Sequence, residues 1–449
     1  MANRITPRTL RGFRDFLPEM MMPREKLIDR AKEVYRSFGF SPIDTPALEL
    51  LEILTGKGGE ETDRQLYQFE DAGGRRVGMR FDLTVPLARF VAQHAPKLGL
   101  PFKRYHIATV WRGENTQRGR YREFMQCDFD TIGSLAVATD IETALVIHDL
   151  MRRMDLTSQQ DFTAFQIRIN NRQILNGLLD QLGLSEGSTL ILRALDKLPK
   201  IGAEKVGTEI SVSGADAGQV NKILEFASLQ GSNDEILTRL SNIIGGNEVG
   251  QAGVARLADT IQGIRAAGID ESHVQIDVSI ARGLDYYTGM IYETFLTDLP
   301  TIGSVCSGGR YDNLAELYTK QQLPGIGASL GLDRLLAALE ELNKIEKVAT
   351  PAKVFVAFFD KQRLHDYLSI ANLIRQSGIS VELYPDPKKL GAQLKYADER
   401  GFRIAVIAGD QELDKNEVQV KDLAAKSSSV CSLEQDGEEL IKELGRILA

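Results

Sequence analysis

The stretch RGRYREFMQCDFD, from Arg118 to Asp130, places clustered arginines directly before a regular alternation of polar and apolar residues. Successive side chains of a β-strand point to opposite faces. Read as a strand, its second half has an aromatic ring, an amide and two carboxylates on one face: Phe124, Gln126, Asp128 and Asp130. Such a face could bind a substrate, although a solvated strand face would show the same pattern when taken alone.

Polar residues of matching chemistry recur in other segments. GMRFDLTV, YHIATVWRGE, ARGLDYYTG and a later helix start contribute Asp82, Thr84, Arg112, Glu114, Arg282, Tyr286, Tyr287 and Arg334. Two acids, a glutamine and a threonine suit an ammonium group and an imidazole. Three separate arginines suit a triphosphate, because a guanidinium matches phosphate oxygens in geometry and keeps its charge. The sequence has neither GxxxxGK[ST] nor a strand–GxGxxG–helix unit, which argues against a P-loop and a dinucleotide-binding fold.

An antiparallel sheet is expected to position these residues. YHIATVWRGE and the strand that follows Phe124 are predicted to pair as a hairpin through the polar loop 115–119. The alternation in GMRFDLTV predicts another strand over 78–85, with Asp82 and Thr84 on one face. Further strand patterns follow in HVQIDVSIA, MIYETFL, SVCSGGRYDNL and GIGASLG, the last leading into an amphipathic helix.

Changes of pattern along the chain predict two domains joined by a linker. Residues 1–345 are expected to form a catalytic domain with a helical insertion at about 171–268, where apolar residues recur at helical spacing. Charge and proline at 346–352 indicate the linker. Strands and helices alternate over 353–449, which is typical of a small α/β domain with a partly parallel sheet. The predicted fold class is α/β (α+β), an antiparallel sheet with flanking helices, the insertion and this C-terminal domain.

Composition narrows the functional classes. The 449 residues carry a net charge of −8, so non-specific nucleic-acid binding by the whole surface is disfavoured. Locally, five arginines and one glutamate between Arg104 and Arg122 give a net charge of +4 that could meet a polyanion. No apolar run suggests a signal peptide or membrane anchor. Three widely spaced cysteines suit a reducing compartment, so a cytoplasmic protein without membrane contact is expected.

Together these motifs resemble the histidyl-tRNA synthetases, a class II family, over essentially the whole chain. GFSPIDTPALE is similar to the first class II motif, VWRGENTQRGRYREFMQCDFD to the second and GIGASLGLDRLLAAL to the third. ARGLDYYTG and SVCSGGRYDNL resemble the more specific histidine-enzyme motif. The resemblance implies that ATP and L-histidine form histidyl-adenylate and pyrophosphate, and that histidine then passes to the 3′ end of tRNA(His). It also implies Mg²⁺ bound with ATP, a homodimer with Pro46 at the dimer-forming position, and a C-terminal anticodon-binding domain.

The resemblance assigns roles around ATP. Arg112 and Arg282, the expected catalytic residues, hold the α-phosphate from opposite sides, and Arg112 also contacts the substrate carboxylate. Phe124 stacks on adenine, with Arg334 on the other side and near the γ-phosphate. Glu114 lies close to adenine. Arg120 is assigned to ATP, although its loop could instead reach the tRNA acceptor stem.

The resemblance likewise assigns the histidine pocket. The α-ammonium group falls to Asp82, Thr84 and Gln126, and the imidazole to Asp130 and Tyr287, with Tyr286 and Tyr311 beside them. An imidazole is distinguished from other rings by its two nitrogens, so the pocket needs an acceptor for one N–H and a partner for the other. Asp128 has no assigned role beyond support of its neighbours. Asp130 and Asp333 stand where glutamate occurs in other members.

A regulatory, non-catalytic paralogue acting in histidine biosynthesis is the main alternative. Such paralogues typically lose the ATP-binding arginines and the C-terminal domain, both of which this sequence retains. Synthetases for proline, threonine or glycine lack RGLDYYTG, and a stand-alone tRNA-binding module would need no catalytic arginines.

Overall fold

The computed structural model describes residues 5–55, 63–156, 161–195, 197–280, 286–347 and 349–449. The chain divides into two compact units, one comprising Met1–Asp15 with Arg24–Ile345 and the other Phe16–Pro23 with Glu346–Ala449. Of the helices in the described ranges, none combines the length and apolar character needed to cross a membrane.

The larger unit is built on an eight-stranded sheet in the order β1-β5-β6-β11-β10-β9-β7-β8. Its strands are β1 (Ser41–Pro42), β5 (Phe102–Trp111), β6 (Glu123–Ile132), β7 (Phe165–Asn171), β8 (Val274–Ile276), β9 (Met290–Leu296), β10 (Cys306–Tyr311) and β11 (Gly325–Gly331). Pairing is antiparallel except at the two edges, where β1–β5 and β7–β8 are parallel. The predicted antiparallel sheet is confirmed, and so is the β5–β6 hairpin.

Helices cover this sheet. A second, three-stranded sheet has the order β2-β4-β3 and is formed by the chain between β1 and β5. The small sheet comprises β2 (Leu48–Leu50), β3 (Gln68–Glu70) and β4 (Arg76–Met79). The helices outside the insertion are α1 (Pro18–Ser37), α2 (Leu51–Leu54), α4 (Thr84–Leu98), α5 (Val137–Arg152) and α12 (Leu332–Glu341). Short 3₁₀ turns occur at η1 (Ser185–Gly187), η2 (Glu271–His273), η3 (Pro300–Ile302) and η4 (Leu314–Leu317).

One face of β6 packs against α1, as the alternation predicts. Cys127 and Phe129 are fully buried on this face. The Tyr35 ring of α1 lies 5.3 Å from the Phe129 ring, and its hydroxyl donates to the Cys127 carbonyl at 2.8 Å. The apolar residues of β6 therefore anchor the strand, which leaves the polar residues facing the opposite side of the sheet.

The strand predicted over 78–85 is wrong in its second half. β4 ends at Met79, and α4 begins at Thr84. Pro86 cannot donate to a sheet ladder but is tolerated in the first turn of a helix. Asp82 accepts hydrogen bonds from the backbone amides of Thr84 and Val85, at 3.1 and 2.9 Å, and so caps the first turn.

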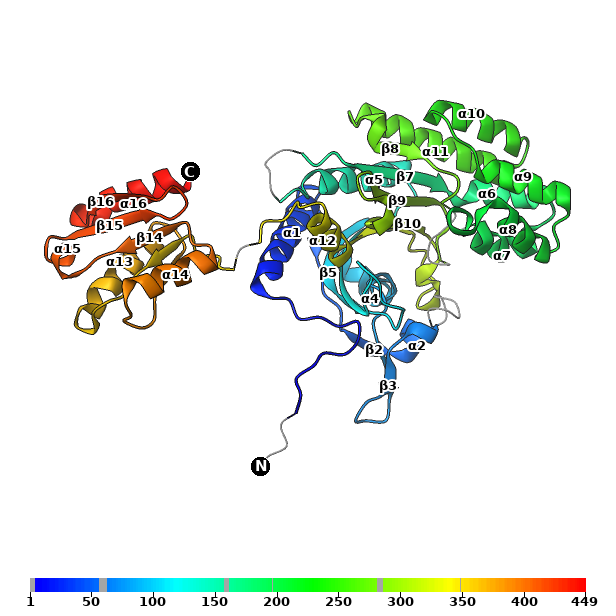
Figure 1. The fold of residues 1–449 in the computed structure, drawn as a ribbon. Helices are drawn as coiled ribbons and strands as arrows, with labels where there is room; N and C mark the ends of the chain where they lie inside the picture. Colours follow the sequence, from blue (N-terminus) through cyan, green and yellow to red (C-terminus); the bar gives the residue numbers. More distant parts are fainter. Residues whose placement is uncertain (1–4, 56–62, 157–160, 196, 281–285, 348) are drawn as a thin grey trace. The chain divides into compact units, whose positions relative to one another are not determined.

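The insertion helices gather beside β7 and β8 (Figure 1). They are α6 (Arg172–Gln181), α7 (Ser188–Leu195), α8 (Leu198–Val212), α9 (Ala217–Ala227), α10 (Asn233–Ile244) and α11 (Glu248–Ala266). Capping boxes begin α9 at Asp216 and α10 at Ser232.

A buried carboxylate joins the insertion to the sheet. Asp140 of α5 is fully buried, and its two oxygens pair with Arg256 of α11 at 2.5 Å and Arg310 of β10 at 2.8 Å. Arg310 also donates to the Ser134 carbonyl at 3.0 Å. One acid thus ties three elements together, and each guanidinium compensates charge on the same side chain.

The C-terminal unit has a five-stranded sheet of order β13-β12-β14-β15-β16. Its strands are β12 (Val354–Val356), β13 (Val381–Leu383), β14 (Ile404–Ile407), β15 (Glu417–Asp422) and β16 (Ser427–Ser432). Its helices are α13 (Leu364–Gln376), α14 (Leu390–Arg400), α15 (Asp410–Asp414) and α16 (Glu434–Leu448), with a 3₁₀ turn η5 (Lys361–Arg363). β12 pairs in parallel with both β13 and β14, and the other pairs are antiparallel, which confirms the predicted partly parallel sheet.

Candidate active site

Glycines of β11 and β10, the next two strands of the same sheet, continue the polar face of β6 as a floor without side chains. Gly327 pairs with Asp130 on one side and with Gly309 on the other. A Cβ atom at Gly327 would lie 2.3 Å from Asp130 Oδ1, and one at Gly309 would lie 3.2 Å from the Tyr287 ring. A Cβ at Gly325 would lie 2.3 Å from the Tyr311 ring. These glycines are strand residues whose missing side chains leave the room that three predicted site residues occupy.

Asp130 lies at the centre of this pocket and is almost fully buried. The Tyr311 hydroxyl donates to its Oδ1, and Nη2 of Arg104 lies 2.6 Å from its Oδ2. Burial raises the pKa of Asp130, while the Arg104 guanidinium acts in the opposite direction. Oδ1 is therefore held by a hydrogen bond, whereas Oδ2 contacts the Arg104 guanidinium as an ion pair and has no hydrogen-bond partner among the described residues.

Gln126 and Asp128 continue the same face toward the other end of β6. The Gln126 amide donates to the Ser329 hydroxyl of β11 at 2.9 Å. Burial raises the pKa of Asp128 to about 7, with Arg104 opposing the shift and Asp130 adding to it. Asp128 therefore belongs to the pocket and not to a solvated strand face.

Three tyrosines and the start of α4 form the wall of the pocket. The Tyr286 ring lies 5.3 Å from the Tyr287 ring and 6.0 Å from the Tyr311 ring, both edge to face. Burial raises the pKa of Tyr286, and its hydroxyl shares a hydrogen bond with the Thr84 side chain. Burial also raises the pKa of Asp82, with Arg112 opposing the shift. The structure thus brings the seven residues predicted to bind histidine together on one side of the sheet.

The predicted nucleotide residues form a neighbouring basic cluster. Arg112 donates from Nε to the Phe81 carbonyl at 3.0 Å, and its guanidinium carbon lies 5.1 Å from the Phe124 ring centre. Nε of Arg120 lies 3.4 Å from a carboxylate oxygen of Glu114. Burial lowers the pKa of Arg334, the Arg120 and Arg112 charges lower it further, and Glu114 acts in the opposite direction.

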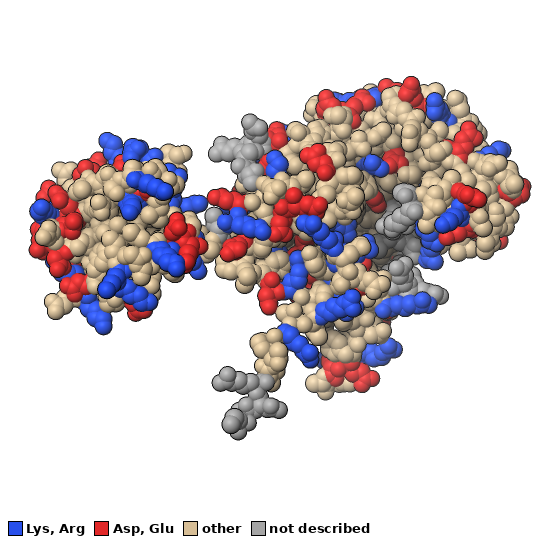
Figure 2. Space-filling model, viewed as in Figure 1, with Lys and Arg blue, Asp and Glu red and all other residues tan. Residues whose placement is uncertain are grey.

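The loop between β5 and β6 brings this cluster onto α12. Gly119 has a φ of +69°, and a Cβ there would lie 3.2 Å from Cγ of Arg334. Arg334 donates to the Ser304 carbonyl at 2.5 Å, which fixes its direction. Lys and Arg side chains line the hollow visible on this face of the larger unit (Figure 2). Arg282 lies outside the described residues.

Asp333 fixes the start of α12, immediately before Arg334. This 2% exposed carboxylate pairs with Arg14 at 2.7 Å and with Arg24 of α1 at 3.6 Å. It also accepts a hydrogen bond from the backbone amide of Met125 in β6 at 2.7 Å. One side chain therefore joins the N-terminal segment, α1, β6 and the helix that carries Arg334.

Replacing Asp333 with alanine is expected to lower the free energy of unfolding by about 3 kcal/mol, because it removes a buried acceptor shared by Arg14, Arg24 and the Met125 amide. The only tryptophan, Trp111, lies in β5 and reports unfolding of this unit by fluorescence during urea titration. Asp29→Ala, which removes an exposed acid paired with Lys32, is the matched control. A loss no larger than that of the control would contradict the linking role.

Arg104 is the pocket residue that sequence reasoning missed. It directly faces Asp130 across the β5–β6 hairpin. The alternation in YHIATVWRGE predicts a strand that begins at Tyr105, so Arg104 falls outside it and contributes only to the local basic patch. Extending the strand by three residues toward the N-terminus would have paired it with the acids.

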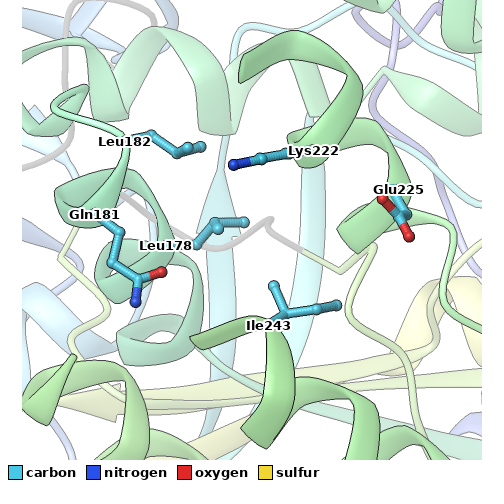
Figure 3. Close-up of a pocket in the computed structure, with 6 residues that line it drawn as sticks. All are labelled: Leu178, Gln181, Leu182, Lys222, Glu225 and Ile243. Carbon is cyan, nitrogen blue, oxygen red and sulfur yellow. The ribbon is translucent and has the colours of Figure 1, made fainter. Parts of the chain in front are cut away.

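A separate pocket of about 520 Å³ lies within the insertion (Figure 3). It is lined by Leu178, Gln181, Leu182, Lys222, Glu225 and Ile243. Leu178, Gln181 and Leu182 lie on one side of it and Lys222 and Glu225 on the other, and none of the predicted site residues is among them.

Comparisons with known proteins agree with this arrangement. The family described as "Histidyl-tRNA synthetase" matches residues 12–335, and an "Anticodon binding domain" matches residues 353–444. A curated "Histidine--tRNA ligase" of Rhodopirellula baltica is 61% identical over 425 residues, which cover 94% of this chain and 95% of that protein. One from Wolinella succinogenes is 44% identical over 97% of this chain and 98% of its own length.

A crystal structure of histidyl-tRNA synthetase from Nostoc sp. PCC 7120 superposes with a TM-score of 0.88 at 35% identity, covering 99% of this chain and 100% of that one. The confirmed fold, the synthetase match over most of the chain and the 61% identical relative lead to one conclusion: the chain belongs to the histidyl-tRNA synthetase family.

Proposed function

We propose that the glycine-floored pocket and the adjoining basic cluster form one active site, in which histidine is activated with ATP and then transferred to tRNA(His). The ligase activity follows from membership of the family. The roles of individual residues are the proposal. The observation that supports them best is that Asp82, Gln126, Asp130 and Arg112 all lie around one buried face of an antiparallel sheet.

Histidine is proposed to bind with its ring against Asp130 and Tyr287 and its ammonium group near Asp82, Thr84 and Gln126. Imidazole N–H donation suits the carboxylate, and the tyrosine hydroxyl can serve the other nitrogen. Tyr286 and Tyr311 pack around the ring and exclude water. A pocket built around such hydrogen bonds discriminates strongly against rings that lack the nitrogens.

ATP is proposed to bind along the basic cluster, with Phe124 under adenine, Arg334 and Arg120 toward the phosphates and Glu114 near the base. Arg112 lies between this cluster and Asp82, where it can hold both the α-phosphate and the substrate carboxylate. Arg282 is proposed to hold the α-phosphate opposite Arg112, on the sequence resemblance alone. The carboxylate is already ionised when it attacks the phosphorus, so these residues act by positioning and charge stabilisation, with no general base.

Mg²⁺ is proposed to bind together with the ATP phosphates. Such a site usually takes one or two protein carboxylates in addition to phosphate and water oxygens. Glu293, whose charge acts on Arg334 near the proposed phosphate position, is the described acid that fits this role. The ion would supply positive charge to the phosphates.

The C-terminal unit is proposed to bind the tRNA anticodon, with α14 as a contacting element. The anticodon-binding match over 353–444 supports this.

A cytoplasmic homodimer is also part of the proposal. Leu48, Leu50 and Phe69 of the small sheet are each more than 40% exposed. Leu48 and Leu50 of β2 lie close in sequence to Pro46, and Phe69 lies in β3, which pairs with the same central strand β4 as β2 does. Exposed apolar side chains of this kind often mark a protein interface.

The purified chain is expected to exchange labelled pyrophosphate into ATP only when L-histidine is present, because adenylate formation is reversible and requires the pocket to be filled. Reactions without an amino acid, and with proline, threonine or glycine, are the controls. No exchange, or exchange driven by another amino acid, would contradict the proposal.

A further inference from the structure

Arg104 is a guanidinium sealed inside the histidine pocket. It is 0% exposed. Its Nη2 lies 2.6 Å from Asp130 Oδ2, 3.9 Å from Asp128 Oδ2 and 3.5 Å from the Leu83 carbonyl. Among the described residues, its Nε and Nη1 have no hydrogen-bond partner. A cation so poorly hydrated is stable only because the acids beside it compensate its charge.

The two acids of β6 outnumber this cation. Asp128 and Asp130 are 2% and 3% exposed. Asp130 pairs directly with Arg104 across the β5–β6 hairpin, whereas Asp128 pairs with His106 and reaches Arg104 only diagonally, at 3.9 Å. When both carboxylates are ionised, which for Asp128 requires a pH above its raised pKa of about 7, the two acids and the one guanidinium carry a net charge of −1. If only Asp130 were present, the pair would be neutral and would attract an imidazole N–H less. If Arg104 were absent, two negative charges would face each other in a dry pocket.

One carboxylate oxygen of Asp128 has no hydrogen bond to any described residue. Its Oδ1 is buried and lacks a hydrogen-bond partner within the described part of the chain. Its other neighbours are the Ser329 hydroxyl and Arg104. A buried carboxylate oxygen without a partner lowers the stability of the fold. A role in substrate binding would explain why an acid stands at this position.

We propose that Arg104 is a positioning residue for histidine recognition, which holds Asp130 against the ring site, and that Asp128 restores the negative charge that this ion pair would otherwise cancel. The inference rests on the proposed function, in which Asp130 contacts the imidazole. It adds a charge-balanced trio whose members are interdependent. Arg104 acts through Asp130 and does not itself touch the substrate.

The test is a double-mutant cycle with Arg104→Met and Asp128→Asn in the full chain, read as separate KM values for histidine and ATP in pyrophosphate exchange. Arg104→Met is expected to raise KM for histidine by about 30-fold or more, since it removes one partner of a buried charge pair. Asp128→Asn is expected to raise it by about 10-fold. Each variant should change KM for ATP by less than about 3-fold, because the trio lies outside the nucleotide cluster.

Rescue in the double variant separates this role from a merely structural one. Arg104→Met/Asp128→Asn restores a net charge of −1, so its KM for histidine should be lower than that of Arg104→Met alone. Arg403→Met, which breaks a 2.8 Å ion pair with Asp422 in the C-terminal unit, is the matched control. A wild-type KM in Arg104→Met, a parallel rise in both KM values, or a double variant at least as impaired as the product of the singles would overturn the proposal.

Asp128→Asn and Asp130→Asn keep the test decisive if Arg104→Met does not fold. An unchanged KM for histidine in Asp128→Asn would by itself overturn the charge-balance proposal. A wild-type KM in Asp130→Asn would instead overturn the ring contact of the proposed function. A raised KM in Asp130→Asn, with no change in the Arg104 and Asp128 variants, would remove only the present inference.

Discussion

Arg112→Ala is expected to reduce histidine-dependent pyrophosphate exchange by about 10³-fold or more, while the fold and the proposed dimer persist. The guanidinium carbon lies 4.3 Å from the Phe81 ring centre, and Nε donates to the Phe81 carbonyl at 3.0 Å, so the charge is fixed before substrates arrive. A preorganised cation stabilises the transition state without having to reorganise. Alanine at this position leaves the α-phosphate and the attacking carboxylate without their shared partner.

The measurement is kcat for exchange at saturating histidine and ATP, with size-exclusion chromatography to follow the oligomeric state. Arg446→Ala removes an exposed guanidinium that pairs with Glu443 at 2.7 Å, and this control should retain full activity. Turnover of Arg112→Ala within about 3-fold of the unmodified chain would remove Arg112 from the mechanism.

Gly327→Ala is expected to raise KM for histidine by about 10-fold or more and to destabilise the fold. The added Cβ would lie 2.2 Å from the Phe129 carbonyl oxygen and 2.3 Å from Asp130 Oδ1, so β6 and β11 must separate or Asp130 must move. Forcing a methyl group into such a packed site costs about 1–3 kcal/mol or more, and it displaces the carboxylate proposed to bind the ring. KM for histidine and the thermal midpoint of unfolding measure the two effects.

Gly391→Ala is the matched control, because a Cβ at Gly391 of α14 would meet nothing within 4 Å. Alanine in a helix is favoured over glycine, so this control should unfold at an equal or slightly higher temperature. If Gly327→Ala keeps the KM of the unmodified chain for histidine, the glycine floor has no part in the pocket.

The sequence predicts the sheet and most of the site because strand alternation places Gln126, Asp128 and Asp130 on one face without further information. The alternation in GMRFDLTV predicts Asp82 and Thr84 on a strand, whereas the structure has them at the start of α4. Helix start and strand alternation look alike over a few residues, and the cap formed by Asp82 depends on a backbone turn that the pattern does not encode.

The sequence pattern does not identify residues whose role depends on partners that are distant in the chain. Arg104 and Asp333 resemble ordinary charged residues in the sequence, because what defines them is their partners: Asp130 lies on the neighbouring strand, and Arg14 is 319 residues away from Asp333. The glycines of β10 and β11 could equally have been turns. Only their register against Tyr287, Tyr311 and Asp130 shows that they leave room for other side chains.

Asp140 constrains anyone who would shorten this enzyme. Excising α6–α11 to obtain a minimal synthetase would delete Arg256 and leave the buried acid with Arg310 alone. The remaining pair would be neutral, but Asp140 Oδ2 would lose its 2.5 Å contact, and Arg310 directly precedes Tyr311 of the proposed amino-acid pocket. A successful truncation must therefore import a replacement cation or neutralise position 140, and library designs that vary the two sites together should yield active miniatures more often than simple deletions.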